Sequence, residues 1–253
     1  MPLRVIISGA SSGLGMALAR HYAALGAILG LIARQERPLQ ILVEELSNAS
    51  YYVADVRDAQ TMRSVAQTFI QHHGCPDIVI ANAGISNGTL TEHAEDTEVF
   101  ENILATNVIG MLNTFQPFII PMRNSKKGKL VGIASVAGYR GLPGSGAYSA
   151  SKAAAISYLE SLRVEMHGSG ISVITICPGY IITPMTENNP FRMPFILTAE
   201  KASKKIIHAI ENKKLFAVIP WQMSIIARIL KLLPNFLYDR LFAKIQHKPR
   251  HHI

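Results

Sequence analysis

Residues 5–15 read Val-Ile-Ile-Ser-Gly-Ala-Ser-Ser-Gly-Leu-Gly, and this stretch decides the fold of the chain. Its apolar start does not alternate with polar residues, which is typical of a strand buried on both faces of a parallel sheet. The glycines permit a tight turn, and the helix expected after them offers free N–H groups and a partial positive charge to a phosphate. A strand, a glycine loop and a helix in this order predict a dinucleotide site, with an ordinary strand–helix turn as the alternative. The loop residues expected to bind the cofactor are Gly9, Ser11, Ser12, Gly13, Leu14 and Gly15.

Apolar strand-like runs alternate with helix-length segments along most of the chain. Strands are expected at 5–8, 28–33, 51–54, 78–81, 130–134, 173–177 and 216–219, and helices at 13–25, 38–47, 58–72, 96–123, 148–167 and 199–212. Such alternation predicts an α/β fold of the Rossmann type, a doubly wound parallel sheet of about seven strands with helices on both faces. No repeat, low-complexity tract or linker divides the chain, so residues 1–220 are expected to form one catalytic domain.

The composition is that of a globular protein. Of the 253 residues 49% are hydrophobic, and only two are cysteines, so no disulfide framework is expected and a reducing compartment fits. The histidines lack metal-ligand spacing, so no metal site is expected. Met1 to Arg4 leads directly into the first strand without a signal peptide, and no run approaches the roughly eighteen apolar residues of a membrane span.

The end of the second expected strand bears on the choice of cofactor. An NAD site usually places Asp or Glu about twenty residues beyond the loop, to accept from the ribose 2′-OH. This chain has Ala33 there, which removes the carboxylate, and then Arg34, which can pair with a 2′-phosphate through two parallel N–H donors. The sequence therefore predicts NADP(H), with Arg34 as a solvated loop residue in the alternative interpretation. The residues expected to line the adenine and ribose side are Asp55, Val56, Asn82, Ala83 and Gly84.

Three side chains are placed for proton transfer. Ser135 follows the fifth expected strand, so it lies at the carboxyl edge of the sheet, where open α/β folds bind ligands. Tyr148 and Lys152 are four residues apart at the start of a helix, so they share one face. An ammonium group there is expected to lower a tyrosine pKa that is ordinarily near 10. Tyr148 could then exchange a proton with a carbonyl or alcohol oxygen while Ser135 holds that oxygen.

With these motifs in this order, the chain resembles the short-chain dehydrogenase/reductase family over residues 3–220. The matching pieces are the Gly9, Gly13 and Gly15 loop, Asp55, Asn82-Ala83-Gly84, Asn107, Ser135, Tyr148 with Lys152, and Pro178-Gly179 followed by Thr183. The resemblance implies that Lys152 also bonds the nicotinamide ribose and that Asn107 supports a water-mediated proton relay to it. It further implies that the segment containing Pro178, Gly179, Ile181 and Thr183 passes the nicotinamide carboxamide. Ser8 stands where threonine is usual in the family and Ala81 where asparagine is common, and Ser8 keeps the hydroxyl.

The loop after the sixth expected strand, residues 181–198, is rich in Met, Phe and Pro. This composition favours an apolar lid over the nicotinamide, with packing of the lid on the domain as the alternative. The expected activity is therefore an oxidoreductase that moves a hydride between NADP(H) and an apolar or lipid-like carbonyl or secondary alcohol. A 3-oxoacyl-carrier reductase is the second enzyme hypothesis. A catalytically silent NADP(H)-binding scaffold or sensor is the third, and the complete set of Asn107, Ser135, Tyr148 and Lys152 argues against it.

Positive charge is concentrated near the C-terminus. Residues 1–200 hold 14 Lys and Arg against 15 Asp and Glu, whereas residues 201–253 hold 11 against 2. Two short, basic, amphipathic helices are expected in an extension at 221–253. Residues 221–246 could bind a membrane surface, bind a partner, or pack on their own domain over the cleft, and all three alternatives stay open. The partner would be an acidic carrier protein or another subunit of a homodimer or homotetramer.

The basic extension carries no motif for specific nucleic-acid recognition, so no nucleic-acid partner is expected. The absence of a signal peptide and the small number of cysteines favour a cytoplasmic protein. Under the membrane hypothesis it would be peripheral at the inner face of a membrane.

Overall fold

Seven parallel strands form one sheet in the computed structural model, which describes residues 1–250. Residues 251–253, the end of the predicted extension, lie outside the described residues. The strands are β1 (Arg4–Ser8), β2 (Ile28–Ala33), β3 (Ala49–Val53), β4 (Ile78–Ala81), β5 (Gly128–Ile133), β6 (Ile171–Pro178) and β9 (Phe216–Ile219). Their order is β3-β2-β1-β4-β5-β6-β9, which confirms the predicted Rossmann-type sheet. The order reverses between β1 and β4, where a crevice opens beyond the strand ends.

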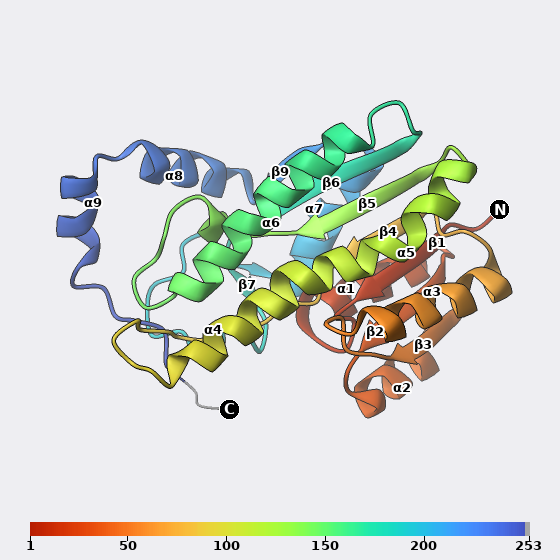
Figure 1. Ribbon diagram of the computed structural model, residues 1–253, viewed down its shortest axis with the longest axis horizontal. Helices are drawn as coiled ribbons and strands as arrows, with labels where there is room; N and C mark the ends of the chain where they lie inside the picture. Colours follow the sequence, from red (N-terminus) through yellow and green to blue (C-terminus); the bar gives the residue numbers. More distant parts are fainter. Residues whose placement is uncertain (251–253) are drawn as a thin grey trace.

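Helices cover both faces of the sheet (Figure 1). The helices of the first layer are α1 (Gly13–Ala24), α2 (Glu36–Glu45) and α7 (Ala199–Glu211). Those of the second are α3 (Ala59–His73), α5 (Gly110–Asn124) and α6 (Gly146–Glu165). Successive strand residues feed opposite cores, since Val5 and Ile7 pack in the first and Ile6 in the second. This two-sided burial explains why the strands are apolar throughout.

The longest helical segment precedes β5. α4 (Asp96–Leu104), a π-helical turn at Ala105–Ile109 and α5 follow one another without a break. This segment, Asp96–Asn124, is long enough to cross a membrane, and its most apolar window has a mean hydropathy of 1.4. The sequence did not predict a membrane span here, because polar residues interrupt the apolar ones. Phe115 and Phe118 are fully buried in the second core. Packing on the sheet therefore explains the apolar residues on the inner side of α5, whereas Leu112 and Ile120 stay exposed.

The predicted extension forms two helices, α8 (Trp221–Leu232) and α9 (Asn235–Phe242), which project from one end of the body in Figure 1. We call these two helices the arm. Beyond α9 the chain returns to the body. There the Lys248 ammonium donates to Ser86 Oγ at 2.9 Å, and the Arg250 guanidinium pairs with Asp96 at 2.9 Å. The end of the described chain, beyond residues 221–246, therefore packs on its own domain.

Arg140, in the loop between β5 and α6, fastens the arm to the body. Its guanidinium donates to the carbonyl oxygens of Leu230 and Leu233 at 2.7 and 2.6 Å. It also lies 4.1 Å from the centre of the Tyr238 ring, and the Tyr238 hydroxyl donates to the Gly141 carbonyl. Carbonyls at a helix C-terminus lack partners within the helix, so a cation placed there stabilises that end of α8.

Replacing Arg140 with methionine tests this attachment. The charged donors are lost while most of the stem is kept, so we expect the arm to open and trypsin to cleave at Arg228 and Lys231 roughly tenfold faster. A tenfold change corresponds to the free energy that one hydrogen bond to a charged group contributes. Cleavage is followed by mass spectrometry of the fragments. Arg163→Met, which removes an exposed 3.8 Å ion pair on α6, is the control. Equal cleavage of the arm in both variants would show that Arg140 does not hold it.

Candidate active site

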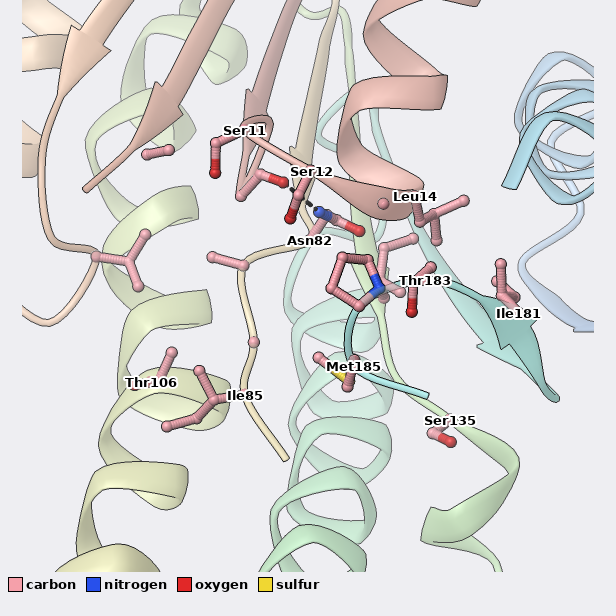
Figure 2. Close-up of a pocket in the computed structure, with 18 of the residues that line it drawn as sticks. Ser11, Ser12, Leu14, Asn82, Ile85, Thr106, Ser135, Ile181, Thr183 and Met185 are labelled. Atoms are coloured by element: carbon pink, nitrogen blue, oxygen red, sulfur yellow. Dashed lines mark hydrogen bonds between the residues drawn. The ribbon is translucent and has the colours of Figure 1, made fainter. Parts of the chain in front are cut away.

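A cleft of about 360 Å³ opens at the carboxyl ends of the strands. Figure 2 shows that its walls come from segments far apart in the sequence, with Ser12, Asn82, Ser135 and Thr183 around one cavity. The predicted residues that line it are Gly9, Ser11, Ser12, Gly13, Leu14, Arg34, Asp55, Val56, Asn82, Ala83, Gly84, Ser135, Tyr148, Lys152, Pro178, Gly179, Ile181 and Thr183. Gly15 and Asn107 do not line the cleft; both are buried behind its wall.

The loop after β1 requires its glycines for two reasons. Gly9 and Gly13 have φ values of +68° and +52°, in the left-handed region that favours glycine. Gly15 instead packs against the loop, because a Cβ there would lie 2.0 Å from the Gly9 carbonyl oxygen. The N-cap residue Ser12 makes no side-chain capping bond, so the first N–H groups of α1 are left for an anionic ligand.

Ser8 and Asn82 join the ends of β1 and β4. The Ser8 hydroxyl oxygen accepts from the backbone N–H groups of Asn82 and Ala83 at 3.2 and 3.3 Å. The Asn82 side-chain amide donates back to the carbonyls of Ser8 and Gly9 at 3.1 and 3.0 Å. Asn82 therefore lines the cleft but uses its amide to brace the glycine loop. Serine in place of threonine keeps the hydroxyl that this arrangement needs.

Three of the four predicted catalytic side chains, Ser135, Tyr148 and Lys152, lie together at the cleft wall. α6 begins two residues before Tyr148, so Tyr148 and Lys152 lie in its first two turns. The Lys152 ammonium lies 5.7 Å from the centre of the Tyr148 ring and donates to the Ile133 carbonyl at 2.9 Å. Ser135, directly after β5, accepts from the N–H of Ala137 at 3.1 Å, which fixes its rotamer. The helix start and the strand end thus bring all three groups to one place.

Burial changes the ionisation of both titratable groups. It raises the pKa of Tyr148, and the interaction with Ser135 opposes this only in part. It lowers the pKa of Lys152 to about 8. The expected lowering of the Tyr148 pKa by Lys152 is therefore wrong for this structure, because desolvation of the phenolate is the larger effect. Tyr148 is accordingly protonated at neutral pH.

Asn107 lies in the π-helical turn, behind the catalytic side chains. Its Oδ1 accepts from the N–H of Ile85 at 2.8 Å, and its amide donates to the Ile85 carbonyl at 3.0 Å and to Ser151 Oγ at 2.9 Å. These bonds tie the π-helical turn to the loop after β4 and to α6. The water-mediated relay that the resemblance implies for Asn107 stays a prediction.

Arg34 lies at the opposite end of the cleft from the catalytic groups, beyond β2. It is exposed, and its guanidinium makes no hydrogen bond or ion pair with any part of residues 1–250. Asp55, nearby, pairs with Arg57 at 2.7 Å. Burial acts to raise the pKa of Asp55, but the hydrogen bonds and charge of Arg57, with a further contribution from the charge of Arg34, together lower it. Asp55 is thus ionised and paired with Arg57, and the Arg34 guanidinium keeps its hydrogen-bond donors free of any protein acceptor in residues 1–250.

The lid begins at β7 (Ile181–Ile182) and ends at β8 (Leu197–Thr198), which pair with each other. Its first turn is fixed by the Thr186 hydroxyl, which donates to the Ile181 carbonyl at 2.6 Å. Several residues that line the cleft were not predicted from the sequence, among them Gln35, Ile85, Thr106 and Thr186. Thr106 precedes Asn107 in the π-helical turn, whose wider ring leaves no mark in hydrophobic periodicity. Among the described residues no cluster of three or more His, Cys, Asp or Glu could hold a metal ion.

Known proteins resemble this chain in sequence and in fold. The family model described as short chain dehydrogenase matches residues 4–192. A protein of Myxococcus xanthus named only as an oxidoreductase is 36% identical over 245 residues, which is 95% of this chain and 96% of that protein. A protein of Streptomyces violaceoruber, named as a ketoacyl reductase of granaticin polyketide synthase, is 35% identical over 188 residues, 72% of this chain and 69% of the relative.

Two solved structures share the fold. A short chain dehydrogenase from Burkholderia cenocepacia in complex with NADP has a TM-score of 0.83 and 24% identity, covering 95% of this chain and 97% of that one. A short chain dehydrogenase/reductase from Burkholderia phymatum in complex with NAD has a TM-score of 0.81 and 21% identity, covering 99% and 98%. The fold is therefore common to proteins that bind either nucleotide.

Gly15→Ala tests the packing of the glycine loop. The new Cβ would displace the Gly9 carbonyl, so we expect the Kd values for NADPH and NADH to rise together by roughly tenfold or more, the equivalent of about 1.4 kcal/mol. Calorimetric titration measures both. Gly146→Ala is the control, because a Cβ at this exposed position meets nothing within 4 Å. Unchanged nucleotide affinity in Gly15→Ala would contradict the role given to this contact.

Proposed function

The chain belongs to the short-chain dehydrogenase family, and from that membership we propose that it is an NADPH-dependent oxidoreductase that interconverts an apolar ketone or aldehyde with the corresponding alcohol. The observation that carries the proposal is the convergence of Ser135, Tyr148 and Lys152 in the cleft that the glycine loop also lines. A protein that only senses a nucleotide needs the loop but has no use for the three catalytic groups.

The cleft has the features that a dinucleotide requires. The uncapped N-terminus of α1 suits a pyrophosphate, and the glycine positions leave no room for larger residues, since a Cβ on Gly9 would lie 2.7 Å from the Ala83 backbone. Gly9, Ser12 and Gly13 would hold the phosphates, and Lys152 the nicotinamide ribose. When bound, the nicotinamide supplies the hydride that adds to the carbonyl carbon, or accepts it in the reverse direction.

Tyr148 would supply the proton. Because burial raises its pKa, its hydroxyl is protonated at neutral pH and can donate to the carbonyl oxygen as negative charge develops there. Ser135 would donate a hydrogen bond to the same oxygen and keep it in line. A pKa of about 8 leaves Lys152 mainly protonated at neutral pH, so it stabilises the phenolate left after the transfer. The alcohol would then hold, on its carbon, the hydrogen transferred as hydride and, on its oxygen, the proton given up by Tyr148.

The preference for NADP(H) rests on Arg34. Its guanidinium makes no hydrogen bond or ion pair within residues 1–250, and the neighbouring Asp55 carboxylate, which feels the Arg34 charge, is itself paired with Arg57. A 2′-phosphate would meet an unpaired arginine there, whereas a 2′-hydroxyl would find no carboxylate acceptor at Ala33. The solved relatives do not decide between the cofactors, since one is in complex with NADP and the other with NAD.

A second candidate substrate is a 3-oxoacyl thioester. The relative from Streptomyces violaceoruber, named as a ketoacyl reductase, favours it. Both candidates use the same proton donor, and both suit a cleft whose lid contributes Ile181, Pro184 and Met185. They differ in what extends beyond the reacting carbonyl, so a panel of apolar ketones, aldehydes and 3-oxoacyl thioesters separates them.

Tyr148→Phe tests the catalytic role. We expect kcat for the best substrate in that panel to fall roughly a thousandfold, within the range typical of a lost general acid, while the Kd for NADPH changes little. The fall in NADPH absorbance measures turnover. Tyr139→Phe, a change at a half-buried tyrosine outside the cleft lining, is the matched control. Full turnover by Tyr148→Phe would exclude Tyr148 as the proton donor.

Arg34→Ala tests the cofactor preference. Loss of the charged hydrogen bonds to a 2′-phosphate should raise the Kd for NADPH by roughly tenfold or more and leave the Kd for NADH nearly unchanged. Fluorescence titration of both nucleotides provides the values. Arg37→Ala removes another exposed arginine, three residues further on in the first turn of α2, and should change neither Kd. Tighter binding of NADH than NADPH by the parent protein would contradict the NADP(H) assignment.

A further inference from the structure

The outward face of α8 is apolar, whereas a helix on the surface of a soluble body normally turns polar residues outward. Met223 and Ala227 face the body and are buried. The residues on the opposite side, with exposed fractions of 66, 51, 58 and 82%, are Trp221, Ile225, Ile229 and Leu232. At 100° per residue these four lie within an arc of about 80°. Met223 and Ala227 supply the contacts of α8 with the body. The four residues on the opposite side therefore form an apolar stripe that is in contact with solvent.

The exposed stripe continues from α8 into α9. Tyr238 turns inward beneath Arg140, and Phe242 stacks on it with ring centres 4.3 Å apart, so these two aromatic residues complete the packing on the body. The exposed apolar residues of the two helices, which we call the arm surface, are Trp221, Ile225, Ile229, Leu232, Phe236, Leu237 and Leu241. Figure 1 shows both helices projecting beyond the body, so this surface belongs to a prominence on the molecule.

Positive charge borders the arm surface. Residues 221–246 contain one acidic residue, Asp239. The basic residues in the same segment, all exposed, are Arg228, Lys231, Arg240 and Lys244. On α8, exposed Arg228 follows Ile225 by three residues and precedes Leu232 by four, so helical spacing places it beside the apolar stripe. Apolar residues bordered by basic ones are the pattern of a helix that lies in the interface of an anionic membrane.

We propose that the arm surface docks this enzyme on an anionic lipid membrane. α8 is about 18 Å long, too short for a hydrocarbon core of about 30 Å, so the arm lies in the interface and does not span it. A second copy of the chain is a poorer occupant, because two arms would bring like charges together. The lipid surface accepts both the tryptophan and aliphatic side chains and the bordering cations.

Docking would also orient the cleft. Arg140 links the arm to the loop that precedes Tyr148, and beyond the arm Lys248 donates to the carbonyl of Met185, a lid residue that lines the cleft, at 3.1 Å. The arm is thus connected to two walls of the substrate site. If the substrate is apolar, docking brings the cleft to the phase in which that substrate dissolves. This orientation rests on the proposed function; the docking itself does not.

The test is co-sedimentation of the full chain with vesicles of phosphatidylcholine, with and without phosphatidylserine. The parent should partition at least roughly tenfold more strongly onto the anionic vesicles. The double variant Arg228→Glu with Lys231→Glu should lose that preference entirely, since each basic residue near the surface is worth about fivefold and the two together roughly 25-fold. Ile225→Gln with Ile229→Gln should weaken binding to both kinds of vesicle by roughly tenfold.

Matched controls separate docking from general effects of charge and hydrophobicity. Lys204→Glu with Lys205→Glu changes two exposed lysines of α7, and Val164→Gln changes a 63% exposed apolar residue of α6. Neither should alter partitioning. Failure of the parent to sediment with anionic vesicles would overturn the proposal. A smaller oligomer in the Ile225→Gln with Ile229→Gln protein, with vesicle binding unchanged, would also overturn it and identify a second copy as the occupant.

Activity in vesicle-free buffer keeps the two proposals apart. None of the arm or control substitutions touches the cleft, so their rates of NADPH oxidation should equal that of the parent. A parent protein that binds anionic vesicles but reduces nothing in the substrate panel would refute the proposed function and leave the docking supported.

Discussion

Parallel strands end at the same edge of a sheet, and the site of this protein depends on that constraint. Loops that are far apart in the sequence follow β1, β4, β5 and β6, and all of them open on one cleft. The bonds between Ser8 and Asn82 hold the first two of these loops together. With the glycine loop fixed in this way, the start of α6 can place Tyr148 within reach of the same cavity.

Much of this arrangement could be predicted from the sequence, because its chemistry needs certain residues at certain spacings. Short runs of Val and Ile located all seven strands to within two residues at each end. The glycines between β1 and α1, and the spacing of Tyr148 and Lys152, were sufficient to locate two walls of the cleft. The residues that were missed depend on contacts between distant segments. Thr106 reaches the cleft only because the helix widens into a π-helical turn, and local periodicity carries no signal of that.

The ionisation of Tyr148 shows the same limit. Its spacing from Lys152 suggested a lowered pKa, but the degree of burial cannot be read from spacing, and in the structure burial dominates. The result still suits carbonyl reduction, because a protonated tyrosine is the form that can donate. The C-terminal extension was open to three interpretations from sequence. The structure divides it into an inner face held by Arg140, a returning end held at Ser86 and Asp96, and an exposed apolar face.

The central claim is that this protein delivers a hydride from NADPH to a carbonyl carbon while Tyr148 delivers the proton. The most direct measurement uses NADPH deuterated at its transferable position, with mass spectrometry of the alcohol formed by the parent and by Tyr148→Phe. We expect one deuterium on the carbinol carbon with the parent protein and almost no alcohol with Tyr148→Phe. Unlabelled alcohol from the parent, or labelled alcohol formed equally fast by Tyr148→Phe, would contradict it.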